Sequence, residues 1–69
     1  MVIHSANDTP TEEKFYLSFD IHKVVLSTGE REIVVPNQIY WMDGKWYGGT
    51  PMYWAEMPTV EELKGVANV

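Results

Sequence analysis

The chain has 69 residues and a mass of 7.9 kDa, which allows one small domain with a modest core. It contains no cysteine, so disulfide bonds and thiolate metal sites are excluded. Ten acidic residues against five basic ones give a net charge of -5, which disfavours direct binding to a nucleic-acid backbone. We therefore expect residues 1–69 to form a single domain that is stabilised by aromatic packing, by self-association or by both.

The N-terminal third predicts an arm followed by a strand. Residues 1–8 carry little pattern and are expected to form a loose arm. Residues 9–12, Thr-Pro-Thr-Glu, have the spacing of a capping box with proline at the first helical position, which predicts one helical turn. From Phe15 to Ile21 every second residue is apolar, which predicts a strand that buries this set of side chains. A helix over residues 10–22 stays open as an alternative, because several apolar residues from Leu17 onward also fit one helical face.

The middle of the chain predicts two hairpins. The first strand continues to Leu26, and residues 27–30 supply a turn. Residues 32–35 predict a second strand, which Pro36 ends because proline cannot donate to a ladder. Residues 38–42 predict a third strand and residues 45–47 a fourth. Asp-Gly at positions 43 and 44 predicts a two-residue type I′ turn between them, because both central residues must adopt positive φ.

The C-terminal third predicts a last strand and a short helix. Residues 52–56 form the fifth predicted strand, which ends at Pro58. Thr59 and Glu62 have capping-box spacing and open a helix to about Lys64, with Gly65 as its C-cap. Residues 66–69 are expected to be a frayed tail. The predicted fold is mainly β: a small antiparallel meander or partly open barrel of about five strands with a short C-terminal helix.

The register of the second hairpin places its aromatic residues on two faces. With a two-residue turn, Trp41 faces Trp46 in the close pair that lacks hydrogen bonds. The indoles are expected to lie inside with Trp54, and the tyrosines partly outside. Tyr and Met are enriched at protein interfaces. We therefore predict a partner-binding face, and its candidate residues are Tyr40, Met42, Tyr47 and Tyr53.

Catalytic chemistry finds little support in the sequence. The two histidines, His4 and His22, lack the spacing of metal ligands, so we expect no metal and no other cofactor. Ser18, Asp20 and His22 share one strand face, but residues two apart on a strand lie roughly 6–7 Å from each other, too far for a hydrogen-bonded relay. We expect a protein without enzymatic activity and with no evident small-molecule substrate.

The second half of the chain resembles a known family. Residues 39–46 and 53–58 are similar to a short domain-of-unknown-function family of enteric bacterial phages and prophages. Members carry a Tyr-x-x-Gly-x-Trp hairpin and a Thr-His-Trp-x-x-Leu-Pro ending, and here Tyr53 replaces the His and Met57 the Leu. The resemblance covers about residues 24–62. It implies a phage or prophage origin and a small β fold, with no known activity and no catalytic residues.

Two functional hypotheses follow. The first is a non-catalytic interaction protein, such as a phage accessory protein that binds and modulates a host protein, with self-association as a further possibility. The alternative is an acidic nucleic-acid mimic, or a weak single-strand binder that combines aromatic stacking with Lys14, Lys23 and Lys45. No apolar run approaches the roughly 20 residues of a membrane span, and residues 1–13 lack the pattern of a signal peptide. We therefore expect no membrane partner and a location in the cytoplasm of a host bacterial cell.

Overall fold

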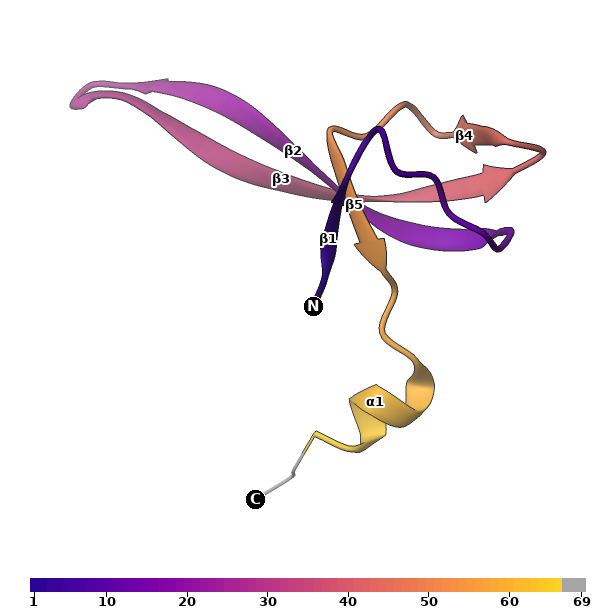
Figure 1. Ribbon diagram of the computed structural model, residues 1–69. Coiled ribbons are helices and arrows are strands. Elements are labelled where there is room, and N and C mark those ends of the chain that lie inside the picture. The colour runs from indigo at the N-terminus through magenta and orange to yellow at the C-terminus, as the bar shows by residue number, and fades with distance from the viewer. Residues whose placement is uncertain (67–69) are drawn as a thin grey trace.

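The computed structural model describes residues 1–66 and shows a mainly β protein. Five antiparallel strands form one open sheet in the order β1-β5-β2-β3-β4, and a short helix follows at the C-terminal end (Figure 1). The mainly β prediction is therefore confirmed. β2, β3 and β4 follow one another as a meander, and β5 returns to the other side of β2. The elements are β1 (Ile3–Ser5), β2 (Lys14–Leu26), β3 (Gly29–Met42), β4 (Lys45–Tyr47), β5 (Tyr53–Glu56) and α1 (Val60–Lys64).

β2 and β3 form a long two-stranded ribbon that dominates the sheet. They pair without interruption from Lys14 opposite Trp41 to Leu26 opposite Gly29. The prediction that Pro36 ends a strand is wrong, because β3 runs straight through it. Counting from the turn at residues 27 and 28, which joins β2 to β3, Pro36 falls in a pair without hydrogen bonds. Its nitrogen therefore points away from β2. β4 reaches only as far as Tyr40, so that edge is open and no ladder bond is lost at Pro36.

The tight turn at Asp43 and Gly44 has the predicted geometry. Their φ angles are 54° and 70°, as a type I′ turn requires. The predicted register is confirmed, with Trp41 opposite Trp46. The two indole rings meet edge to face with their centroids 4.8 Å apart. The turn therefore brings Trp46 back over the sheet, where it joins the core.

The N-terminal residues differ from the prediction in two ways. Residues 1–8 are not simply a loose arm, because β1 pairs with β5 within them. The helical turn predicted over residues 9–12 is absent, and this segment belongs to an irregular loop. A single turn has little stability of its own. The loop instead uses its carbonyl groups to bind the core: Trp54 Nε1 donates to the Asp8 carbonyl at 2.9 Å, and Tyr16 Oη donates to that of Glu12 at 2.9 Å.

The core lies on one side of the sheet, which we call the aromatic face. Its buried residues Tyr16, Ile39 and Trp54 pack together, with Trp41 and Trp46 partly buried against them. The expectation that Phe15 and Ile21 lie on the buried side of their strand is therefore wrong. The buried residues of β2 are Tyr16 and Ser18, which lie between them. Tyr16 is buried because its ring packs edge to face against Trp54 and Trp46, at centroid distances of 5.1 and 5.9 Å.

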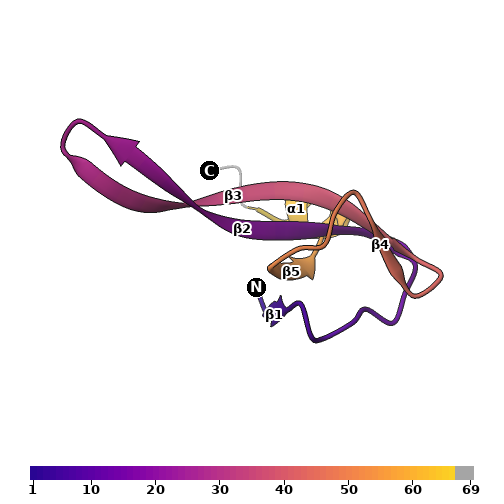
Figure 2. The ribbon, with the colours of Figure 1, turned by 90° about the horizontal axis from the view of Figure 1, so that it is seen from above.

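The molecule is thin for its width. Its principal extents are 42, 41 and 17 Å, and the ribbon of β2 and β3 twists as it projects beyond β5 and β1 (Figures 1 and 2). The capping box of α1 is confirmed, since the Thr59 hydroxyl accepts from the Glu62 amide and the Glu62 carboxylate accepts from the Thr59 amide. Within residues 1–66, α1 buries none of its residues and packs against none of the strands. The predicted frayed tail begins at Val66, which is exposed, and its remainder lies outside the described residues.

Candidate protein-binding face

The side of the sheet opposite the aromatic face is apolar and largely uncovered, and we call it the open face. The alternation of side chains along each strand puts every second residue there. The 50% exposed ring of Phe15 meets Tyr40 on this side, with centroids 4.7 Å apart. The central residues of the open face are Ile3 of β1, Phe15, Leu17, Phe19 and Ile21 of β2, Val34, Pro36, Gln38, Tyr40 and Met42 of β3, Tyr47 of β4, and Tyr53 and Ala55 of β5. None of these side chains carries a charge, whereas Lys23, Glu30 and Glu32 lie on the same side at the far end of the ribbon and Lys45 at the β4 end.

A shallow hollow lies in the middle of the open face. It has a volume of about 390 Å³ and is lined by six residues, all of them apolar or aromatic: Met1, Ile3, Phe19, Ile21, Val34 and Tyr53. The lining comes from four strands and the N-terminal residue, so it is built by the sheet and not by one loop. An exposed apolar surface that spans several elements is typical of a protein-interaction site.

All four residues predicted to bind a partner lie on the open face. Tyr40 pairs with Tyr47, Met42 lies two residues further along β3, and Tyr53 pairs with Phe19 of β2. Met42, Tyr47 and Tyr53 are exposed, and Tyr40 is half-buried against Phe15. The structure therefore brings these four side chains to one side of the sheet, with Tyr53 near its centre and the others at one end.

Sequence reasoning missed the larger part of this face. The apolar alternation from Phe15 to Ile21 was the signal, but it predicted a buried side and not an exposed one. Val34 was missed as well, and it is 63% exposed. Alternation identifies which residues share a side of a strand. It does not say which of two apolar sides the rest of the chain covers.

The covered side depends on two hydrogen bonds to the N-terminal loop. The bonds from Trp54 and Tyr16 fasten residues 8–12 over the aromatic cluster, and Pro10 is buried there. His4 stacks on Trp54 with ring centroids 4.2 Å apart. Burial raises the pKa of the Tyr16 phenol above its ordinary value of 10.0, and the nearby charge of Glu56 raises it further. The loop therefore covers one side of the sheet and leaves the other open.

The buried phenol predicts a loss of stability in alkali. A raised folded-state pKa stabilises the fold below pH 10.0, and this contribution disappears as the pH rises through the folded-state pKa. Tyr16→Phe should cost about 1 kcal/mol at neutral pH, because it removes the hydrogen bond to the Glu12 carbonyl. Between about pH 9 and about pH 11 its melting temperature should then fall less than that of the wild type. Thermal melts of both proteins across this range test the prediction, and parallel pH profiles would contradict it.

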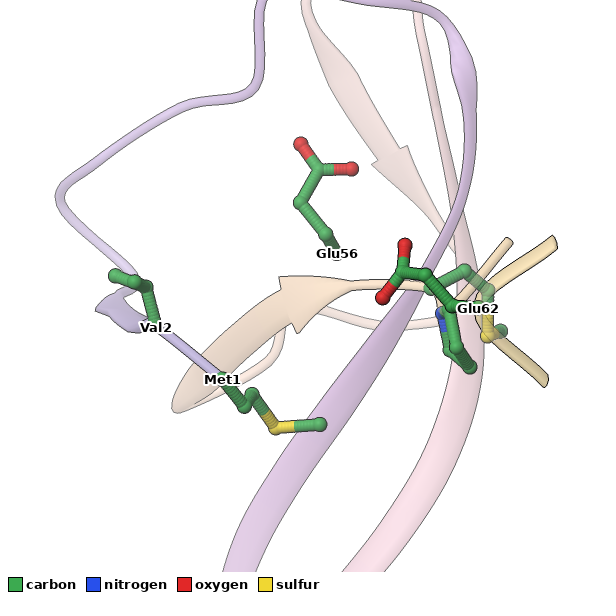
Figure 3. A pocket seen from close by; sticks show the side chains of 6 residues that line it. Met1, Val2, Glu56 and Glu62 are labelled. Atoms are coloured by element: carbon green, nitrogen blue, oxygen red, sulfur yellow. The ribbon is translucent and has the colours of Figure 1, made fainter. Parts of the chain in front are cut away.

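A second pocket holds two carboxylates, and both already have partners. It has a volume of about 270 Å³ and lies between the N-terminal residues and the segment that leads from β5 into α1 (Figure 3). Glu56 and Glu62 project from separate parts of this segment. Glu56 binds Lys14 Nζ at 2.8 Å, and Glu62 caps α1. The Lys14 ammonium has a raised pKa, mainly because of its hydrogen bond to Glu56. These contacts give both acids structural roles.

The three residues that share one face of β2, Ser18, Asp20 and His22, form no catalytic relay with one another. Ser18 is buried, Asp20 accepts a hydrogen bond from the Met52 amide at 3.1 Å, and His22 is exposed. Within residues 1–66, no three His, Asp or Glu side chains gather as metal ligands do. In the same residues, no helix is long and apolar enough to cross a membrane. The open face is therefore the feature of the described chain that best fits a functional site.

Comparisons with protein-family models, with curated proteins and with solved structures find no match to this chain.

Proposed function

We propose that this chain is a non-catalytic interaction protein that binds a protein partner through the open face. The observation that carries this proposal is the apolar side of the sheet, which is uncharged over its centre, has exposed side chains from β1 to β5 and holds a hollow at its centre. Exposing a surface of this kind to water is unfavourable, and covering it with a partner lowers the free energy. The acidic groups that surround the molecule keep it soluble until that happens.

The resemblance of residues 24–62 to a phage domain family suggests the setting. In a phage or prophage, a small accessory protein of this kind acts by binding and modulating a host protein. The tyrosines and Met42 at the β3–β4 end of the open face suit such contacts, because aromatic side chains bury large areas with little loss of rotamer freedom. We propose these residues as the part of the face that gives most of the binding energy.

Nucleic-acid binding has weaker support. Lys14 lies 2.8 Å from Glu56 and 3.4 Å from Glu12, and Lys23 lies 3.7 Å from Glu30. Two of the three lysines that the single-strand binder requires are therefore next to carboxylates, which lowers the local positive potential. The described carboxylates are also spread over both faces and the loops, whereas a mimic of a phosphate backbone needs them in rows.

Affinity capture from host lysate tests the proposed function. Tyr47→Ala should weaken partner capture by at least about 10-fold, because it removes an exposed ring from the binding face. Arg31→Ala is the matched control, since Arg31 is an exposed β3 residue whose alternation puts it on the opposite side of the sheet. The control should capture as well as the wild type.

A charge reversal separates the two hypotheses. Glu30 and Glu32 lie at the end of the open face that is far from Tyr40 and Tyr47. Glu30→Lys combined with Glu32→Lys should therefore leave capture through the tyrosine end nearly unchanged at both low and high salt. If Tyr47→Ala binds normally while the charge reversal abolishes capture, the open-face proposal is wrong. Capture that also falls steeply with ionic strength would then support the acidic mimic.

A further inference from the structure

The chain exposes more surface than a folded monomer of its mass. A monomer of 7.9 kDa exposes about 4,400 Å² by the usual scaling with mass, whereas this chain exposes 5530 Å². The excess is about 1,100 Å². The radius of gyration is 15.0 Å, compared with about 11 Å for a compact domain of 69 residues. Both quantities include α1, which packs against no strand in residues 1–66, as well as the uncovered open face.

The missing packing can be located on the sheet. An apolar sheet face is stable when it packs against another element, and here only the aromatic face has such a second layer, made by the N-terminal loop. The projecting end of the ribbon has no third strand, and an isolated two-stranded hairpin is marginal in water. The helix does not supply the cover, because it packs against no strand in residues 1–66 and leaves Val60 and Leu63 exposed.

We propose that the open face binds a second copy of this chain, so that two sheets pack face to face as a β-sandwich dimer. This inference rests on the proposed function, since it names the protein that the open face binds when no host partner is present. The centre of the contact is the hollow formed by Phe19, Ile21, Val34 and Tyr53 together with the N-terminal residues. A host protein that uses the same face would have to displace the second copy.

The size of the surface fits a homodimer. If each copy buries the excess of about 1,100 Å², the interface totals about 2,200 Å², which lies in the range of obligate homodimers. The apolar centre of the face can also pack against itself without burying an unpaired charge. An interface related by a two-fold axis requires this self-complementarity.

Among the described residues of the open face, charged side chains stand at its two ends. Lys45 lies at the β4 end, where the Glu13 carboxylate accepts a hydrogen bond from the Asp43 amide. Glu30 and Glu32 lie at the far end of the ribbon, where Lys23 offsets one of them. The centre of the proposed interface is therefore free of charge, and the charged groups lie at its rim.

The mass of the purified protein in solution is the first test. Light scattering on a sizing column should give about 16 kDa, twice the 7.9 kDa of the chain, at protein concentrations near 100 µM. The melting temperature should also rise as the protein concentration increases from about 1 µM to about 100 µM, because the dimer is favoured by mass action. A mass of 7.9 kDa and a constant melting temperature over this range would overturn the proposal.

A pair of lysine substitutions locates the interface. Val34→Lys places a charge in the hollow and should weaken dimerisation by at least about 100-fold. His22→Lys adds a lysine on the other side of the ribbon, one residue from Ile21, and should leave the dimer intact. Circular dichroism checks that both variants keep their β structure. A Val34→Lys protein that stays dimeric would overturn the assignment of the open face.

Cross-linking gives a test that does not depend on a destabilised variant. The chain has no cysteine, so single thiols can be placed at will. A bifunctional thiol reagent of about 10 Å, the separation of packed sheets, should join Ile21→Cys chains into dimers and leave His22→Cys chains unlinked. Equal cross-linking of both variants would overturn the proposed geometry. A monomeric wild type that still loses host capture in Tyr47→Ala would overturn the dimer alone and leave the proposed function standing.

Discussion

Trp54→Ala should lower the free energy of unfolding by roughly 3–5 kcal/mol, which is most of the stability expected for a domain of this size. Trp54 is only 4% exposed and its ring contacts His4, Tyr16 and Trp46. Its indole N–H also donates to the Asp8 carbonyl and so fastens the loop that covers the aromatic face. One substitution therefore removes the largest core side chain of β5 and releases the cover above it. Urea denaturation followed by circular dichroism measures the loss.

A nearby exposed residue provides the control. Met52 is 47% exposed, lies two residues before Trp54 and is not part of the aromatic cluster. Met52→Ala should change the free energy of unfolding by less than about 0.5 kcal/mol. If Trp54→Ala were as stable as Met52→Ala, the core would have to lie elsewhere, and the distinction between the aromatic face and the open face would fail.

Local signals were sufficient for the Asp43–Gly44 turn and for the cap of α1, whereas the same capping-box spacing at residues 9–12 formed no helix. A type I′ turn needs positive φ at both central positions and Asp-Gly is a preferred sequence for it, so the register of Trp41 and Trp46 followed from this two-residue turn. The helix at residues 60–64 followed from the side-chain chemistry of Thr59 and Glu62, which acts within four residues. In both cases the residues that decide the conformation are neighbours in the sequence.

The choice of the buried face could not be made locally. β2 has apolar or aromatic residues on both sides, and Tyr16 looked like the polar member of the alternation. Its burial depends on the carbonyl of Glu12 and on Trp54, which is 38 positions away in the chain. Pro36 was misjudged for a related reason, because whether a strand tolerates proline depends on whether that edge has a neighbour. The part of the open face at the hairpin of β3 and β4 was thus predictable from the sequence. Predicting the rest of this face requires knowing which strands are neighbours in the sheet.

Gly44→Val should destabilise the protein by roughly 1–3 kcal/mol through the turn alone. Gly44 has a φ of 70°, and a β-branched residue at this position is strained even though a Cβ atom there would meet nothing within 4 Å. The cost is therefore one of backbone conformation and not of crowding. β4 is only three residues long and pairs with nothing except β3, so within residues 1–66 it has no second strand to hold it in place.

The reporter for this change is the pair of indoles that the turn brings together. With ring centroids 4.8 Å apart, Trp41 and Trp46 should give an exciton couplet in the circular dichroism spectrum of the wild type. Asp43→Asn keeps a residue that tolerates positive φ, so it should retain the couplet and most of the stability. Gly44→Val should lose the couplet at temperatures where the remaining β signal persists, because β4 separates before the long ribbon of β2 and β3 unfolds. A couplet that survives in Gly44→Val up to the global melting temperature would mean that core packing of Trp46, and not the turn, holds β4 against the sheet.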